Sequence, residues 1–217
     1  MTERAEKRVR LSPEARRAQL IALGVEMLAT RTLDELSVDD IAQQAGISRG
    51  LLFHYFSSKQ EFHLEVARAA AQELLRRTMP DQSKPPLEAL QESLAAFIDY
   101  VEENPDGYTS LVRGAASGDA DMRAISDGTR ATLAARVVDV VASMGLQMQA
   151  GAQLAVHGWV AFVEECVVTW IATRSVDRDR LLDLLGKSLP AVVLASTDEE
   201  VGSLVTILTS DVAISAQ

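Results

Sequence analysis

The sequence has a single cysteine, Cys166, among its 217 residues. One chain therefore cannot form an internal disulfide, and it offers no set of thiolates for a metal site. The cysteine lies in the apolar stretch FVEECVVTW, whose pattern is typical of a helix in a core. This setting favours a small buried side chain over a reactive nucleophile.

Long hydrophobic runs are also lacking. No segment holds the roughly 18 uninterrupted apolar residues that a membrane-spanning helix needs. The first ten residues, MTERAEKRVR, carry charges with no apolar stretch behind them, unlike a secretory signal. We therefore expect a soluble, cytoplasmic protein without a membrane partner. With 47% hydrophobic residues, the chain is long enough to bury a substantial core.

The familiar motifs of enzymes are missing as well. The sequence has no phosphate-binding Gly-rich loop, no dinucleotide-binding glycine triad, no Gly-x-Ser-x-Gly and no His-Glu-x-x-His. His157 and Glu164 lie on one predicted helix, but seven residues separate them by about 10 Å of rise, which is too far for a shared site. The sequence thus predicts no catalytic residues, no cofactor and no metal ion.

The sequence also lacks the alternating β-branched runs and hairpin turns that indicate a sheet. Its six prolines leave long intervals with the 3.6-residue periodicity of amphipathic helices. An all-α fold is therefore predicted. Charge is unevenly spread: the first 60 residues carry nine Lys and Arg against eight Asp and Glu, and the remainder carries 12 against 23. The acidity belongs to the C-terminal part, and the N-terminal part has a basic arm in its first ten residues.

Helix start signals recur in the N-terminal part. Serine caps predict helices over about 12–30, 37–45, 48–56 and 58–78, the first with proline at its opening position. Gly46 lies between the second and third helices and can adopt a left-handed backbone at no steric cost. Two short helices joined by such a turn predict a helix-turn-helix.

The third helix of this unit presents two different faces. Leu52, Tyr55 and Phe56 share the inward face, and Arg49, Gly50, Phe53 and His54 point outward. Arg49 can pair with guanine or phosphate, Gly50 lets a backbone N–H approach a phosphate, and His54 can donate to one. Lys59 adds a positive charge in the first turn of the next helix. The face suits DNA, although a helical hairpin with a few exposed polar residues remains an alternative reading.

The stretch LSVDDIAQQAGISRGLLFHYFSSKQEF resembles the DNA-binding signature of TetR-family transcriptional regulators, over about residues 12–65. The resemblance implies a three-helix DNA-binding domain, a fourth connecting helix, and a larger helical domain that holds an effector pocket. It also implies a homodimer formed through the last two long helices. Many members have threonine and tyrosine where this chain has Leu51 and Phe53, so these two positions cannot donate a hydroxyl. The predicted DNA-contact residues are Ser37, Ser48, Arg49, Gly50, Leu51, Phe53, His54, Tyr55 and Lys59.

We expect three regions: a helix-turn-helix domain with its basic arm at 1–57, an effector-binding and dimerisation domain at 58–195, and a tail at 196–217. In the second region the periodicity predicts helices over 87–104, 120–144, 149–174 and 179–195. The tail either forms a short helix or is disordered.

Seven residues are candidates for an effector pocket: Phe97, Tyr100, Tyr108, Met122, Trp159, Phe162 and Cys166. An aromatic stripe at helical spacing is also typical of an ordinary core, so that reading stays open. Few basic residues lie near these aromatics in the sequence, which favours a neutral or cationic hydrophobic effector, although a long acyl chain is not excluded.

These features predict a repressor that binds a palindromic DNA operator as a homodimer and is released by a small hydrophobic effector. The coupling between pocket and DNA is expected to pass through the fourth helix, 58–78. Two alternatives remain: an architectural DNA-binding protein without an effector, and a small helical enzyme that depends on Cys166 or His157.

Overall fold

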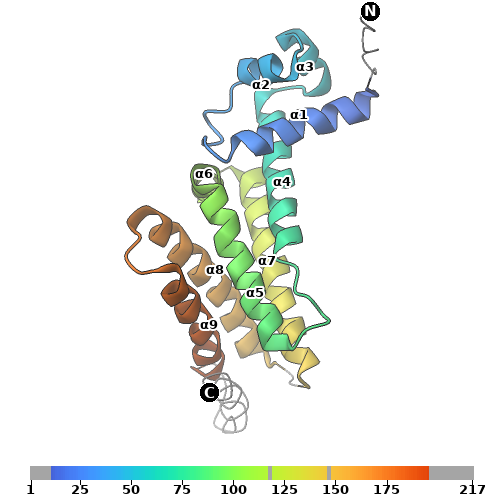
Figure 1. Ribbon diagram of the computed structural model, residues 1–217. Coiled ribbons are helices and arrows are strands. Elements are labelled where there is room, and N and C mark those ends of the chain that lie inside the picture. The colour runs from blue at the N-terminus through green and yellow to red at the C-terminus, as the bar shows by residue number, and fades with distance from the viewer. Residues whose placement is uncertain (1–10, 117–118, 146–147, 196–217) are drawn as a thin grey trace, which may run out of the picture.

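The computed structural model describes residues 11–116, 119–145 and 148–195, and these residues form helices without strands. The all-α prediction is confirmed for this part of the chain (Figure 1). The predicted basic arm and C-terminal tail lie outside the described residues. The helices are α1 (Pro13–Met27), α2 (Val38–Ala45), α3 (Arg49–Tyr55), α4 (Lys59–Arg77), α5 (Pro86–Glu103), α6 (Pro105–Ala116), α7 (Ala120–Ser143), α8 (Ala150–Thr173) and α9 (Arg178–Ala195).

All four predicted serine caps form as the sequence indicates. Ser12, Ser37, Ser48 and Ser58 each accept a hydrogen bond from the backbone N–H three residues further on, at 3.0–3.2 Å. Each bond satisfies one of the free donors in the first turn of its helix. The starts of α1 to α4 are therefore fixed by residues within the same turn.

The N-terminal helices enclose a core of their own. Leu20 of α1, Ile41 of α2, Leu52 of α3 and Phe62 of α4 are all fully buried in one cluster. Along α4 this cluster extends as far as Ala70, and Met122 of α7 (Ala120–Ser143) also belongs to it. We call this unit the head: it consists of α1 to α3 and the first half of α4, and it lies at the top of Figure 1.

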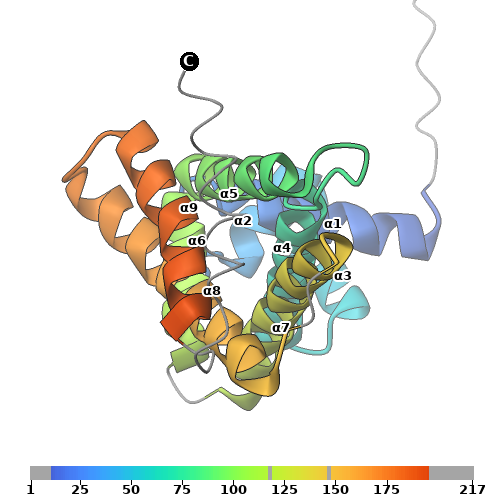
Figure 2. The ribbon, with the colours of Figure 1, turned by 90° about the horizontal axis from the view of Figure 1, so that it is seen from below.

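The second core lies in a bundle formed by the remainder of α4 and by α5 to α9. Its buried cluster begins at Leu74 on α4 and reaches Leu189 on α9. Seen from below, α5, α7, α8 and α9 surround this core while α4 enters from the head (Figure 2). Because α4 contributes to both cores, any tilt of α4 relative to the bundle also reorients the head.

The sequence failed to predict α6. The periodicity predicted helices over 87–104 and 120–144 with none between them, but residues 105–116 form a helix. Proline is well suited to the first turn of a helix because its missing N–H would have no partner there. Gly107, in this first turn, packs so closely on the end of α1 that an added Cβ would lie 2.3 Å from the carbonyl oxygen of Leu28.

Among the described residues, α8 is the one helix that is long and apolar enough to cross a membrane by length and composition. Its buried side, which includes Val156, Trp159 and Val167, packs in the core of the bundle. Its other side keeps Leu154 75% exposed and Phe162 41% exposed. The helix thus has apolar surface on two sides, and the chain itself covers one of them.

Candidate DNA-binding surface and effector cavity

The turn between α2 and α3 has the geometry that the glycine predicted. Gly46 has φ 64° and ψ 37°, in the left-handed region, where a side chain would be strained. Beyond it, the N–H of Ile47 donates to the carbonyl of Ala42 at 2.9 Å and closes the end of α2. The chain then enters α3 at its cap, Ser48. The helix-turn-helix is confirmed.

Helix α3 buries one side in the head and exposes the other. Leu52 is fully buried and Tyr55 is partly buried, while the outward residues are accessible to solvent. Five residues of this helix that were predicted to contact DNA are exposed: Arg49, Gly50, Leu51, Phe53 and His54. The two hydrophobic ones, Leu51 and Phe53, are 39% and 38% exposed, so this helix offers apolar side-chain surface to a partner.

The charged groups around α3 are held only loosely by the protein. Arg49 forms an ion pair of 3.2 Å with Asp39 and lies 5.7 Å above the ring of Phe53, but both charged side chains are more than 60% exposed. An ion pair this exposed contributes little stability and exchanges readily. Lys59 donates to the carbonyl of Asp34 at 3.3 Å. Both cations can therefore turn to a phosphate at small cost.

The serine caps remain able to contact DNA. The oxygens of Ser37 and Ser48 accept backbone hydrogen bonds at the starts of α2 and α3. A hydroxyl that accepts such a bond still has its own proton to donate. A phosphate at either helix start would be a suitable acceptor.

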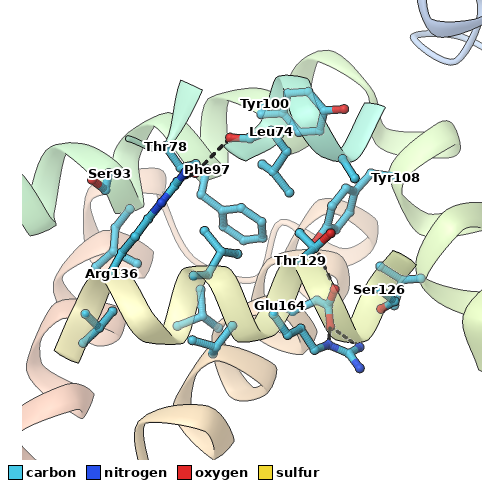
Figure 3. A pocket seen from close by; sticks show the side chains of 18 of the residues that line it. Leu74, Thr78, Ser93, Phe97, Tyr100, Tyr108, Ser126, Thr129, Arg136 and Glu164 are labelled. Carbon is cyan, nitrogen blue, oxygen red and sulfur yellow. Dashed lines mark hydrogen bonds and ion pairs between the residues drawn. The ribbon is translucent and has the colours of Figure 1, made fainter. Parts of the chain in front are cut away.

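A cavity of about 120 Å³ lies inside the bundle, between α4, α5, α6, α7 and α8 (Figure 3). We call it the effector cavity. Most of its lining is apolar, and α4 contributes the small side chains Ala67, Ala70 and Ala71. Five of the seven sequence-predicted pocket residues line it: Phe97, Tyr100, Tyr108, Met122 and Trp159.

The other two candidates, Phe162 and Cys166, do not line this cavity. Trp159 points inward, and along α8 its inward neighbour is Val163, four residues on, rather than Phe162. At about 100° per residue, Val163 lies about 40° from Trp159 around the helix axis, whereas Phe162 lies about 60° to the other side of Trp159. The side chain of Phe162 therefore points away from the cavity. Cys166 is half-buried beside the core, where burial and the charge of Glu165 raise the pKa of its thiol.

A polar network occupies one end of the cavity. The hydroxyl of Tyr108 donates to Glu164 at 3.0 Å, and Arg130 donates to the same carboxylate through Nε at 2.7 Å and through Nη2. Burial, and then the charge of Glu164, raise the pKa of Tyr108 well above its usual value. Tyr108 therefore stays a neutral donor, and the charges of Arg130 and Glu164 cancel.

The other end of the cavity holds Arg136, which the sequence analysis did not single out. Its Nη1 donates to the carbonyl of Leu75 at 2.7 Å and to the hydroxyl of Thr78 at 3.2 Å. Burial lowers the pKa of this guanidinium. Few basic residues lie near the aromatics in the sequence, but α7 brings both Arg130 and Arg136 into the lining.

The cavity also reaches the head. Met122, which lines it, belongs to the buried cluster of the head, and Leu111 and Ile125 line the cavity while packing against that cluster. A further link is the bond from the N–H of Leu33 in the head to the hydroxyl of Ser110 on α6, at 2.9 Å. The contacts between the bundle and the head are therefore not confined to the fourth helix, since α6 and α7 also touch the head. The expected coupling through the fourth helix stays a prediction.

Two family matches together span the head and the bundle. Residues 20–66 match the family described as "Bacterial regulatory proteins, tetR family", and residues 86–192 match "Tetracyclin repressor-like, C-terminal domain". The crystal structure of a tetR-family transcriptional regulator from Streptomyces coelicolor superposes with a TM-score of 0.76 and 26% identity, covering 95% of this chain and 100% of that one.

Relatives of described function support the same grouping. The HTH-type transcriptional activator FasR of Mycolicibacterium smegmatis is 27% identical over 184 residues, which are 80% of this chain and 81% of that protein. The HTH-type transcriptional repressor KstR2 of Mycobacterium tuberculosis is 37% identical over 92 residues, 42% of this chain and 46% of that protein. With its helix-turn-helix, its helical bundle and these matches, the chain belongs to the TetR family of DNA-binding bacterial transcriptional regulators.

Proposed function

We propose that this protein is a cytoplasmic homodimeric repressor that a small, mainly hydrophobic effector releases from a palindromic operator. The observation that carries the proposal is the effector cavity, whose lining includes Met122 of the head's own core. A molecule that enters this cavity touches the packing that orients the head. The similar proteins include both an activator and a repressor. The choice of a repressor therefore rests on the contact between the cavity and the head.

The DNA interface is assigned to the exposed side of α3 and the helix starts around it. Arg49 and the apolar surface of Leu51 and Phe53 would enter the major groove, with the apolar groups against thymine methyls. Phosphate contacts would come from Ser37, Ser48, Gly50, His54, Tyr55 and Lys59. Phosphate contacts fix the position of the head, and base contacts supply sequence preference.

The dimer interface is assigned to α8 and α9. Leu154 and Phe162 on α8 and Leu184 on α9 are 75%, 41% and 48% exposed, which is a large apolar area for a free surface. These two helices pack on one another, and a second copy related by a two-fold axis would complete a four-helix interface. Two heads related by this axis would read an inverted repeat.

Release follows from the size of the cavity. Pockets for small ligands usually measure about 300–1,000 Å³. A cavity of about 120 Å³ is closer to the engineered apolar cavity of about 150 Å³ that holds benzene. A larger effector therefore has to part the helices, and α4 with its alanine lining is connected directly to the head. The effector can lower DNA affinity only by the ratio of its own affinities for the released and the DNA-bound arrangements of the helices. This ratio is typically about 5- to 150-fold.

The alternatives account for less of the structure. An architectural protein without an effector gives no role to a cavity that adjoins the head. For an enzyme that depends on Cys166 or His157, neither residue can assist the other, because nine positions along α8 separate them by about 13.5 Å of rise. The raised pKa of Cys166 also keeps its sulfur protonated as a thiol.

The test combines selection of an operator with a titration of effectors. Operators are selected from random DNA, and affinity for the selected site is measured against a scrambled duplex at fixed, moderate salt. Compounds that raise the thermal stability of the protein are then titrated into the operator complex. We expect an inverted-repeat operator and a loss of affinity with a stabilising apolar compound. Equal affinity for operator and scrambled DNA would contradict the repressor, and stabilising compounds that leave DNA binding unchanged would contradict the release mechanism.

A further inference from the structure

The two arginines that line the effector cavity differ in how they are paired. Arg130 presents its Nε and Nη2 to the carboxylate of Glu164. Arg136 lies six residues further along α7 and uses only Nη1, toward Leu75 and Thr78. Among the described residues, no carboxylate forms an ion pair with Arg136, and burial lowers the pKa of its guanidinium. Arg136 therefore keeps a positive charge for which the described residues supply no counter-ion.

The free side of Arg136 has the shape of a carboxylate receptor. Its Nε and Nη2 are the same pair of nitrogens that Arg130 uses to hold Glu164, and two parallel N–H donors match two carboxylate oxygens. The bonds to Leu75 and Thr78 hold the guanidinium in place from its other side. Thr78 is itself fixed, because its hydroxyl donates to the carbonyl of Leu74 at 2.8 Å. Little further ordering is needed for an anion to bind.

The distribution of charge in the cavity points to a single anionic group on an apolar body. The charged residues of its lining are Arg130, Glu164 and Arg136, and the first two neutralise each other. Figure 3 shows Arg136, Thr78 and Ser93 at one end and Tyr108, Ser126 and Glu164 at the other, with apolar side chains between them. The six residues from Arg130 to Arg136 correspond to about 9 Å along α7, a span that an alkyl chain can occupy.

We propose that the effector is an alkyl carboxylate whose chain fills the apolar cavity and whose carboxylate binds Nε and Nη2 of Arg136. This inference rests on the proposed effector function of the cavity and specifies its ligand class. It replaces the expectation of a neutral or cationic effector. A cation is disfavoured because Glu164, the one acidic side chain that the described residues contribute to the lining, already receives three hydrogen bonds from Tyr108 and Arg130.

The test measures ligand binding to the protein without DNA. Alkyl carboxylates of six, eight and ten carbons are compared with alcohols and amines of the same lengths, by calorimetry and by the fluorescence of the protein, since Trp159 lines the cavity. We expect carboxylates to bind more tightly than alcohols, and amines to bind least. In Arg136→Gln the carboxylate affinity should fall about ten- to hundredfold, the usual worth of a charge-assisted contact, while alcohol affinity stays the same.

Two further variants serve as controls. Arg123→Gln removes an exposed arginine of the same helix that does not line the cavity, and it should bind carboxylates as the unaltered protein does. Arg136→Lys keeps the charge without the two parallel donors and should recover only part of the affinity. Alcohol binding by Arg136→Gln shows that its cavity is intact. If that variant does not fold, Arg136→Lys and the ranking of ligands on the unaltered protein decide the question.

The inference is overturned if carboxylates bind no better than alcohols, if no alkyl ligand binds, or if Arg136→Gln retains full carboxylate affinity. Failure of the proposed function gives a different result. In that case carboxylates bind through Arg136 but leave operator affinity unchanged. Conversely, release from the operator by alcohols and carboxylates alike, independent of Arg136, would support the repressor and exclude this ligand class.

Discussion

Gly107→Ala should destabilise the junction between α6 and the head. The Cβ of the alanine would lie 2.3 Å from the carbonyl oxygen of Leu28 and 2.7 Å from its Cβ. Because the nearest neighbour is backbone, no change of side-chain rotamer relieves the contact, and the two segments have to separate. Overpacking of this kind typically costs about 1–3 kcal/mol.

The helix propensity of alanine acts in the opposite direction. Replacing glycine by alanine inside a helix gains about 1 kcal/mol, and Gly128→Ala on α7 should show this gain alone, because nothing lies within 4 Å of its added Cβ. The difference in free energy of unfolding between the two variants thus isolates the contact and should be about 1–3 kcal/mol, with Gly107→Ala the less stable. Each 1 kcal/mol corresponds to roughly 2–4 °C in Tm for a domain of this size.

The assay is urea denaturation followed by far-UV circular dichroism, at one protein concentration so that self-association does not differ between samples. A Gly107→Ala variant as stable as Gly128→Ala would refute the close approach of α6 to the end of α1. It would leave the hydrogen bond between Leu33 and Ser110 and the packing of Leu111 as the contacts that join α6 to the head.

Three further outcomes are expected. Lys59→Gln should weaken binding to operator and unrelated DNA alike and reduce the slope of log affinity against log salt by about 1, and an unchanged slope would contradict a phosphate contact. Phe162→Glu should sediment as a monomer with its helicity retained, whereas Ala131→Glu, on the exposed side of α7, should not change the assembly; a dimeric Phe162→Glu would exclude this residue from the interface. Hydrogen bonds from Arg76 and Arg77 lower the pKa of Glu73 from 4.5 to about 2. Glu73 therefore stabilises the folded protein above pH 4.5, and its advantage over Glu73→Gln should vanish as the pH falls toward 2, which denaturation across that range measures; a constant difference would argue against the ion pairs.

The contact between cavity and head gives the proposed switch a short path. Met122 belongs to the head cluster and lines the cavity, so a ligand against this side chain needs no long relay to act on the head. The hydrogen bond between Leu33 and Ser110 adds a polar contact at the same junction. An effector that parts α4 from α7 would therefore act on the head from two sides, through the tilt of α4 and through the packing of α6 and α7.

Most of the head could be predicted from the sequence because its signals are local. A serine cap bonds to a backbone N–H three residues away, and Gly46 acts on its own backbone angles. The burial of Leu52 and the exposure of Arg49 follow from the helical period within one short helix. Such features need no knowledge of distant residues. The signature that resembles the TetR family lies in this same local stretch.

The sequence by itself determined the helical class, the helix-turn-helix and the outward side of α3. The tertiary structure alone decided that Phe162 faces away from the cavity and that α6 packs against the head. It also decided that Arg136, which has no carboxylate partner in the part of the chain that the structure describes, lies beside an apolar space. The residues that line this space lie between Ala67 and Glu164 in the sequence, and most of them belong to the five helices α4 to α8. Periodicity shows that a helix has an apolar side, but where helices such as α8 are apolar on two sides, only the packing of neighbouring helices determines which side becomes core, cavity or surface.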